Sequence, residues 1–573
     1  MNVKHYKTNI RTKIRKNDNK YMFFFGEIVF FCIFAEKLKS TTMKYPIGIQ
    51  SFERIREDGY VYVDKTALIY ELVSKGTIYF LSRPRRFGKS LLISTLENYF
   101  LGRKELFRGL AIDSLEKEWK EYPVFHIDFN GGNYDKDGEL ENRILGSLET
   151  WENQWGKDPI NKELGARIAH VLKQAHEKSG RRAVVLVDEY DKPLLDVIDT
   201  DYTGLLNGKE TKLEDIHRGI LKGLYSVFKL ADKHLQFVLL TGVTKFSQVS
   251  VFSGFNQPKD ISYDSRFDTL CGISKDELLT VFKEQIRELG EMNGMTEEET
   301  IEKLKRKYDG YHFSKQMKDI FNPFSILNCL DSKDFQNYWF STGTPTYLMR
   351  LLANNHENIN ELAGKEYSAA EFVDYKATKQ KPLPMIYQSG YFTIKGYDPT
   401  FDVYRLDFPN EEVRSGMASA LASDYFSSGN YSDSRIVDVT RTLLSGDLEK
   451  FKLQLTAFLA NISYRFQRKQ DAMECERHFQ YTFYLIMCLL GRYNTYIEKE
   501  TSQGRIDCIL ECPDYVYIFE FKLNSTAEVA LKQIEEKGYA QPYAADKRKI
   551  YKVGISFSSE TGTVNDFAYK PCE

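Results

Sequence analysis

The sequence predicts two α/β domains joined by a mainly helical region. In the first half, short apolar runs such as AVVLV at 183–187 and Phe237 to Leu240 alternate with helix-compatible segments, which is typical of a parallel sheet. Near the C-terminus, GRIDCILECPDYVYIFEFKL at 504–523 holds two short apolar strands around a Pro-Asp turn and predicts a hairpin. A chain of 573 residues, 42% hydrophobic and 28% charged, can support two to four domains, each with its own core.

The most specific pattern is the stretch IYFLSRPRRFGKS, which begins at Ile78 and ends in Gly88-Lys89-Ser90 at the start of a helix-compatible segment. In a P-loop, backbone N–H groups cradle the phosphates of a nucleotide, the Lys amine meets the β and γ oxygens, and the Ser hydroxyl binds Mg²⁺. Lys89 and Ser90 fit these roles, but Arg83 stands where the full pattern has a Gly. A GKS triplet alone is also an ordinary helix start.

The predicted nucleotide-binding residues of this loop are Arg85, Arg86, Gly88, Lys89 and Ser90. For the two arginines, a solvated loop charge is the alternative to a phosphate contact.

The run AVVLV supplies the second half of a nucleotide site, because it ends in Asp188-Glu189. This is a Walker B pattern, in which Asp188 supports the Mg²⁺ hydration shell and Glu189 polarises the attacking water. A pair of acids that caps the following turn is the alternative. The run Phe237 to Leu240 ends at Thr241, a polar side chain that could sense the γ-phosphate. The three strand ends together predict nucleotide binding.

These strings carry a family resemblance. SRPRRFGKSLL, VLVDEYDKPL, LLTGVTKFS and the upstream YPIGIQSFERIREDGYVYVDKT closely resemble the bacterial and archaeal AAA-ATPase-like proteins, from about Tyr45 to Ile273. The resemblance continues through YDGYHFS, NPFSIL, YWFSTGTP and YQSGYFTI. It implies an AAA-like P-loop NTPase fold that uses ATP and Mg²⁺. It also implies that Arg83 does not mark an inactive loop, since the family has the same departure.

The hairpin near the C-terminus carries the second set of candidate residues. Asp507 begins its first strand, and Glu520 and Lys522 lie two apart on the second, so that their side chains share one face. Two carboxylates can bind Mg²⁺ or Mn²⁺, the metal activates water, and the Lys orients the nucleophile or offsets developing charge. Alternating charge on a solvated sheet face is the alternative.

The spacing Asp-x12-Glu-x-Lys resembles that of PD-(D/E)xK nucleases, including the domain commonly fused to AAA-ATPase-like proteins, whose ALKQI and KGYA strings recur from Ala530. The resemblance implies a restriction-endonuclease-like α/β domain that acts on nucleic acid, which we expect to be DNA. In the following helix, Gln533 could point back toward the metal face. Glu476 is the candidate for an additional acid, and Glu500 is the second choice.

Between the two candidate sites, the pattern is mainly helical from about 275 to 363, which we interpret as an ATPase lid. A helix followed by a short hairpin suggests a winged-helix module, which either binds DNA or is structural. The predicted boundaries are 1–42 for an N-terminal extension, 43–273 for the ATPase core, 274–380 for the lid, 381–420 for the winged helix, 421–468 for a helical linker and 469–573 for the nuclease-like domain.

Charge, cysteine and histidine patterns give no sign of a strongly basic nucleic-acid-binding protein, a disulfide-rich protein or a zinc protein. The net charge of −2 makes no electrostatic case for nucleic acid, although a local basic face remains open. Eight scattered cysteines without a CxxC indicate reduced thiols, and nine histidines without HExxH give no zinc pattern. The apolar part of the first 42 residues is too short to span a bilayer, and we expect Met43 to be the natural start. We therefore expect a cytoplasmic protein with no membrane contact.

The predicted function is an ATPase coupled to a metal-dependent nuclease, with possible assembly into a homo-oligomer. Arg266 is a guess for an arginine finger and needs a neighbouring subunit. One alternative is a nucleotide-controlled switch or scaffold whose nuclease-like domain binds without cutting. Another is a constitutive nuclease whose altered P-loop is only structural.

Overall fold

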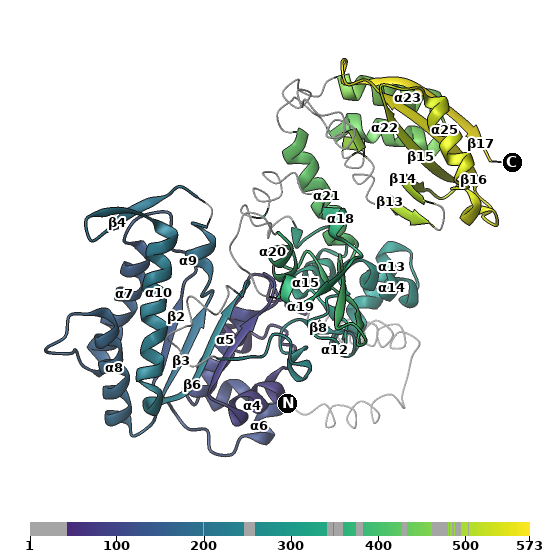
Figure 1. Cartoon of the computed structure of the whole chain (residues 1–573). Helices are drawn as coiled ribbons and strands as arrows, with labels where there is room; N and C mark the ends of the chain where they lie inside the picture. The colour runs from purple at the N-terminus through teal and green to yellow at the C-terminus, as the bar shows by residue number, and fades with distance from the viewer. Residues whose placement is uncertain are drawn as a thin grey trace, which may run out of the picture.

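The computed structural model of the chain describes residues 43–572, apart from 199, 246–257, 341–347, 349–358, 374–381, 427–432, 461–478, 481, 484–485, 487–493 and 502–503. The predicted N-terminal extension, 1–42, and the candidate acid Glu476 lie outside the described residues. Two sheets stand at opposite ends of the molecule, with a helical region between them (Figure 1).

The N-terminal sheet has five parallel strands in the order β2-β3-β6-β1-β7. Its strands are β1 (Ile78–Ser82), β2 (Val124–Asp128), β3 (Ala183–Asp188), β6 (Leu235–Gly242) and β7 (Lys259–Asp260). Every residue of β3 is buried, which explains why its sequence is a continuous apolar run rather than an alternating one. The predicted parallel-sheet α/β domain is confirmed.

Helices cover this sheet. Those of more than eight residues are α4 (Thr66–Lys75), α5 (Lys89–Phe100), α7 (Glu139–Trp155), α8 (Leu164–Ser179) and α10 (Leu213–Leu230). The last three pack beside one another (Figure 1). The shorter ones are α3 (Phe52–Glu57), α6 (Ala111–Leu115) and α9 (Lys192–Leu195). A hairpin of β4 (Thr203–Leu206) and β5 (Lys209–Lys212) turns at Asn207-Gly208, where both residues have positive φ.

The segment that we predicted as a lid is largely helical. It contains α12 (Lys275–Val281), α13 (Lys283–Asn293), α14 (Glu297–Tyr308), α15 (Pro323–Ser332), α18 (Ile359–Leu362) and α19 (Ala369–Phe372). Capping boxes at Ser274 and Thr296 fix the starts of α12 and α14. Asn322 accepts two backbone N–H bonds at the start of α15, where Pro323 takes the first helical position. The short strands β8 (Ile273–Ser274) and β9 (Ile320–Phe321) pair at the base of this region.

Residues 382–426 contain a helix, a hairpin and a second helix. These are α20 (Leu383–Gln388), β11 (Thr393–Asp398), β12 (Val403–Asp407) and α21 (Glu411–Phe426). The strand β10 (Glu366–Ser368), which precedes the range that we predicted as a winged helix, also joins this small sheet in the order β10-β12-β11. The winged-helix boundaries therefore remain a prediction.

The C-terminal domain is a five-stranded mixed sheet in the order β13-β14-β15-β16-β17. Its strands are β13 (Asn494–Thr501), β14 (Gly504–Glu511), β15 (Tyr515–Leu523), β16 (Lys549–Phe557) and β17 (Val564–Pro571). The hairpin β14–β15 turns at Pro513-Asp514 as predicted, and β15 runs parallel to β16. The helix α25 (Ala527–Glu536) connects these two parallel strands and packs against them.

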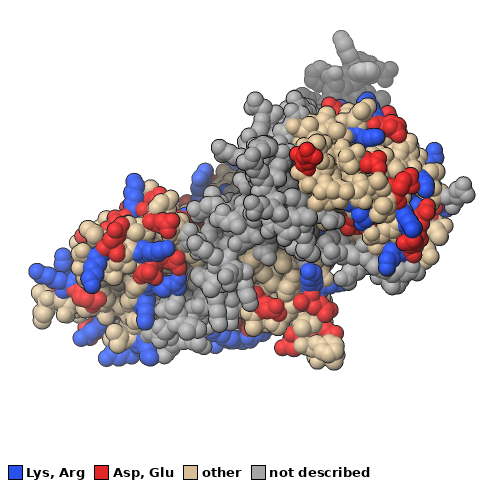
Figure 2. Space-filling view, turned by 45° about the horizontal axis from the view of Figure 1, so that its top comes forward, with Lys and Arg blue, Asp and Glu red and all other residues tan. Residues whose placement is uncertain are grey.

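Two further helices, α22 (Asp433–Ser445) and α23 (Leu448–Ala460), contact the C-terminal sheet. The ring of Phe451 lies 6.2 Å from that of Phe519 and 6.1 Å from that of Phe567. On the face of the molecule seen in Figure 2, acidic and basic side chains are interspersed over both ends. Within the described part of the chain, no helix is both long and apolar enough to cross a bilayer.

Candidate functional sites

The first candidate site lies at the carboxyl ends of three neighbouring strands. In the sheet, β6 lies between β1 and β3, and the register pairs Leu81 with Thr241 and Val187 with Leu240. The loop after β1 and the acidic pair at the end of β3 therefore meet at one edge of the sheet. Parallel α/β sheets bind their ligands at this edge.

The loop between β1 and α5 makes a sharp turn. Gly88 has φ of 92°, which favours glycine, and Arg86 also has a positive φ of 68°. Lys89 is the first residue of α5, and its Nζ donates to the carbonyl oxygens of Arg83 and Pro84 at 3.0 and 3.1 Å. The loop thus wraps around the Lys89 amine, while Gly88 is exposed at the start of the helix.

Arg83, which stands where a P-loop has Gly, points away from this loop and into the protein. It is 1% exposed, and its guanidinium donates to the carbonyl oxygens of Ser82, Ser262 and Phe267 at 2.8 to 3.2 Å. The guanidinium also lies 4.0 Å from the centre of the Phe313 ring. Its contacts join β1 to segments far along the chain, which accounts structurally for Arg at this position.

The acidic pair after β3 has two different environments. Asp188 is buried, and its Oδ1 accepts the Thr241 hydroxyl at 2.6 Å and the Glu189 backbone N–H at 3.0 Å. Thr241 therefore contacts Asp188, and its hydroxyl does not line the pocket described below. Glu189 has a positive φ of 50°, an uncommon conformation for a side chain of this size. Burial raises the pKa of Glu189, and the nearby Lys89 charge opposes that rise.

The buried carboxylate of Asp191 holds the turn that carries Glu189. Its Oδ2 accepts the backbone N–H groups of Val243 and Thr244 at 3.0 and 2.6 Å and the Thr244 hydroxyl at 2.7 Å. The Tyr190 hydroxyl adds a bond of 2.8 Å to the Thr244 carbonyl. The strained Glu189 backbone is thus fixed by bonds to the end of β6.

An open pocket of about 370 Å³ lies over this edge. It brings together all five predicted loop residues and the second Walker B acid, namely Arg85, Arg86, Gly88, Lys89, Ser90 and Glu189. It is also lined by Asn130 and Lys192, which the sequence analysis missed because no motif marks them. A second, smaller pocket of about 100 Å³ adjoins it and shares Gly88 and Leu91, and apolar residues such as Phe87, Ile69 and Phe282 line most of it.

The guessed arginine finger, Arg266, lies elsewhere on the surface and pairs with Asp264 of its own turn.

The second candidate site lies on one face of the C-terminal sheet, where β14, β15 and α25 meet. Glu520 is 1% exposed, and its Oε1 accepts Lys522 Nζ at 3.1 Å and the Gln533 side-chain amide. Asp507 precedes Cys508, the first residue of β14 that pairs with β15, and it accepts the Phe521 backbone N–H at 2.7 Å, so that it stands beside Glu520 across the two strands. The structure therefore brings together Asp507, Glu520, Lys522 and Gln533.

The Glu520 carboxylate is buried close to a second carboxylate, that of Asp507. Burial, with a further contribution from the negative charge of Asp507, raises the pKa of Glu520 to about 7. Its Oε2 is buried and has no hydrogen-bond partner among the described residues. A buried unpaired carboxylate oxygen is costly in a protein interior, and a divalent metal is one group that satisfies it. The donor set thus fits a cation that prefers oxygen ligands.

Sequence reasoning missed one neighbour of this site. Tyr539 is buried, and its hydroxyl hydrogen-bonds the Gln533 side chain, which in turn donates to Glu520. The KGYA string that contains Tyr539 was a resemblance signal, but nothing in the pattern placed this hydroxyl near the carboxylates.

The additional acid is not settled by the described side chains. Glu500 lies in β13, where it pairs with Arg505, and the same register brings Glu498 opposite Asp507. The side chains of both residues are outside the described set. Within the described residues, no group of three or more His, Cys, Asp or Glu side chains is arranged to hold a metal ion.

Comparison with known proteins gives two family matches and one full-length relative. A family described as Predicted AAA-ATPase matches residues 46–252, and the PD-(D/E)XK nuclease superfamily matches residues 474–567. The chain is also 36% identical over 532 residues to the "Uncharacterized protein in vnfD 5'region" of Azotobacter chroococcum mcd 1. That similarity covers 91% of this chain and 98% of the relative. The two candidate sites lie inside the two matched ranges.

Proposed function

This chain belongs to a family of AAA-ATPase-like proteins that carry a C-terminal PD-(D/E)XK nuclease superfamily domain, and on that premise we propose that it hydrolyses ATP and cleaves nucleic acid, with the nucleotide controlling cleavage. The observation that carries the nuclease part is the buried face on which Glu520 contacts Lys522 and Gln533 and keeps one carboxylate oxygen unpaired. The ATPase part is supported by the pocket that Lys89, Ser90 and Glu189 share.

At the ATP site, Lys89 and the backbone around Gly88 bind the phosphates in this proposal. Arg85 and Arg86 add positive charge from the same pocket wall. Ser90 and Asp188 would hold Mg²⁺, with Thr241 orienting the Asp188 carboxylate through their hydrogen bond. Glu189 acts as the base toward water, since its raised pKa favours proton uptake. The adjoining apolar pocket takes the nucleobase.

At the nuclease site, Asp507 and Glu520 would hold Mg²⁺ or Mn²⁺. The bound cation supplies an activated water and charge stabilisation for the phosphodiester. Lys522, whose Nζ lies 3.1 Å from Oε1 of Glu520, would orient the attacking water or offset the developing charge. Gln533 orients Glu520, and Tyr539 orients Gln533.

Three finer points belong to the same proposal. We expect the substrate to be DNA and the protein to assemble into a homo-oligomer, because the guessed finger Arg266 would need a neighbouring subunit. We also expect a cytoplasmic protein, since the five cysteines of the described residues are all free thiols.

The first experiment measures cleavage of plasmid, linear and branched DNA and of RNA, with Mg²⁺ or Mn²⁺, in the presence and absence of ATP. Four variants accompany the wild type. Glu520→Gln and Lys89→Ala change the two sites, and Glu560→Gln and Lys104→Ala change exposed residues of the same kind.

We expect Glu520→Gln to abolish cleavage, and Lys89→Ala to abolish ATP turnover and change the effect of ATP on cleavage. Both control variants should behave as the wild type does. If ATP binds but no substrate is cut under any condition, the protein is a nucleotide-controlled switch instead. If cleavage occurs but calorimetry detects no ATP binding, the first domain is only structural.

A further inference from the structure

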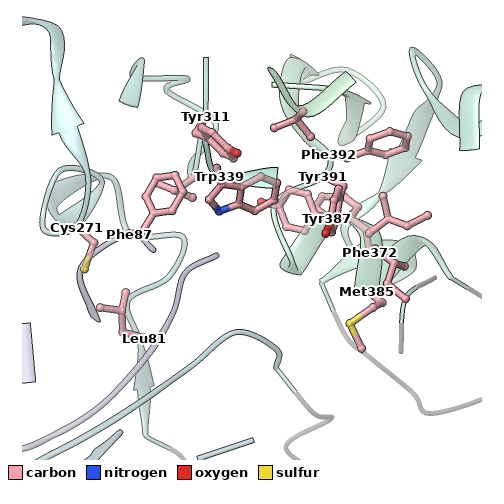
Figure 3. Packing of buried hydrophobic residues seen from close by; sticks show 14 of the residues in the cluster. Leu81, Phe87, Cys271, Tyr311, Trp339, Phe372, Met385, Tyr387, Tyr391 and Phe392 are labelled. Atoms are coloured by element: carbon pink, nitrogen blue, oxygen red, sulfur yellow. The ribbon is translucent and has the colours of Figure 1, made fainter. Parts of the chain in front are cut away.

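The loop between β1 and α5, here called the phosphate-side loop, is hydrogen-bonded to a tryptophan that lies 254 positions further along the chain than Arg85. The Trp339 indole Nε1 donates to the Arg85 carbonyl oxygen at 3.0 Å. Trp339 is 1% exposed, and its ring lies 5.3 Å from that of Tyr391, in the aromatic cluster that also contains Phe87 and Tyr311 (Figure 3). The Arg85 side chain lines the nucleotide pocket, while its carbonyl is held by a packed ring. A shift of this loop therefore acts directly on Trp339.

The same tryptophan is bonded to a buried carboxylate. Glu412 Oε1 accepts the Trp339 backbone N–H, and Oε2 accepts the Ser325 hydroxyl, each at 2.7 Å. Glu412 is 1% exposed. A buried carboxylate that depends on two neutral donors keeps both of them in place, since losing either would leave an oxygen unpaired.

Ser325 provides a second route from the pocket to Glu412. It belongs to the first turn of α15, next to Phe324, which lines the nucleotide pocket. The Arg86 guanidinium lies 4.9 Å from the centre of the Phe324 ring. The two arginines of the loop are thus connected to the same carboxylate, Arg85 through Trp339 and Arg86 through α15.

Glu412 is the second residue of α21, the helix that lies between the two ends of the molecule (Figure 1). Along the chain, α21 is followed by α22 and α23, which pack against each other, and α23 packs on β17 of the C-terminal sheet. The Tyr517 hydroxyl of β15 donates to the Leu443 carbonyl of α22 at 2.5 Å. Tyr517 lies on the same strand as Glu520 and Lys522. The described contacts therefore connect the nucleotide pocket with α21, and α22 with the strand that carries the nuclease site.

We propose that Trp339 and Glu412 are positioning residues that couple the phosphate-side loop to α21. ATP bound near Arg85 and Arg86 then changes the position of α21 and, through α22, the position of the nuclease domain. This inference rests on the proposed function and specifies the route by which the nucleotide acts. Neither Trp339 nor Glu412 is among the residues that line the nucleotide pocket.

The test measures hydrogen–deuterium exchange of the α21 amides in the full-length protein, with and without a non-hydrolysable ATP analogue and Mg²⁺. Trp339→Phe removes the indole N–H but keeps an aromatic ring, and Glu412→Gln keeps the size of the side chain. Trp155→Phe is the matched control, because Trp155 lies at the end of α7, away from this network. Calorimetry with the same analogue measures binding independently of any nuclease activity.

In the wild type and in Trp155→Phe, we expect the analogue to change α21 exchange by about fivefold, the lower end of measured allosteric couplings. In Trp339→Phe and Glu412→Gln, binding persists but the α21 response is lost, and the ratio of cleavage rates with and without ATP moves toward one. An unchanged α21 response in both variants overturns the inference and leaves the proposed function intact. Absence of analogue binding by the wild type defeats the proposed function, and the inference falls with it.

Discussion

Glu520 is the residue on which the nuclease proposal depends most directly. Its pKa is raised to about 7 by burial and by Asp507, and a metal ligand must give up its proton before the metal binds. Below pH 7 a proton competes with the metal, whereas above pH 7 the carboxylate is already ionised. We therefore expect Mn²⁺ affinity to rise between pH 6 and pH 7, by up to about tenfold per unit, and to level off by pH 8.

Calorimetric titration of Mn²⁺ at pH 6, 7 and 8 measures this dependence. Glu520→Gln should remove the pH-dependent binding, and Glu536→Gln, which changes an exposed acid on α25, should preserve it. Equal affinity at the three pH values in the wild type would show that Glu520 is not a ligand.

Gln533 provides a second test at the residue scale. Its amide donates to the Oε1 of Glu520 and receives support from Tyr539, so it orients the carboxylate without being a metal ligand in the proposal. We expect Gln533→Ala to lower the cleavage rate by about 10- to 100-fold, as is typical of residues that orient ligands. The measurement is the cleavage rate at saturating Mg²⁺, with Gln541→Ala, an exposed glutamine, as the control. A rate equal to that of the wild type would exclude an orienting role.

At the scale of elements, the packing of α25 on β16 determines where Gln533 lies. Gly554 of β16 pairs with Glu520, and a Cβ at Gly554 would lie 2.3 Å from the Ala527 carbonyl oxygen of α25. The helix would have to move, and we expect Gly554→Ala to lower the free energy of unfolding by about 1–3 kcal/mol. The same shift should weaken cleavage, because α25 carries Gln533.

Urea unfolding and the cleavage assay measure the two effects of Gly554→Ala. Gly146→Ala is the control, since a Cβ at this position of α7 meets no atom within 4 Å. In a helix interior that substitution should stabilise the protein by about 0.5–1 kcal/mol. Wild-type stability and activity in Gly554→Ala would mean that α25 does not need its close approach to β16.

The elements that the sequence predicted well are those whose signals are local. Apolar runs that end in GKS or Asp-Glu identify buried strands and their carboxyl ends. In the strand 515–523, successive side chains point to opposite faces, so Glu520 and Lys522, two positions apart, share one face. The role of Arg83 was not predictable, because its acceptors at Ser262 and Phe267 lie about 180 residues away. The same holds for Asn130 and Lys192, which join the pocket only through the packing of the sheet and its turns.

Register was a further limit on prediction. Spacing alone made Glu500 a candidate acid, but the pairing of β13 with β14 brings Glu498, rather than Glu500, opposite Asp507. Glu498 and Glu500 are two positions apart on β13, so the alternation of the strand does not distinguish them, and only the register of β13 against β14 decides which of them is opposite Asp507.

At the scale of the whole molecule, the two sheets that carry the candidate sites stand at opposite ends, and α21 lies between them (Figure 1). A ligand at one site can influence a distant site only if it binds one conformation of the elements between them more tightly than another. Binding of ATP must therefore be established independently of cleavage.

Thermal unfolding of the full-length protein provides that independent measurement. A ligand that binds only the folded state stabilises it, by about 2.7 kcal/mol at 100 times its dissociation constant. We expect ATP with Mg²⁺ to raise the unfolding midpoint of the wild type, of Lys104→Ala and of Glu520→Gln, whose change lies at the other end of the molecule. Lys89→Ala should lose the shift, because the amine enclosed by the loop carbonyls is removed. A shift that persists in Lys89→Ala would mean that ATP binds elsewhere on the chain.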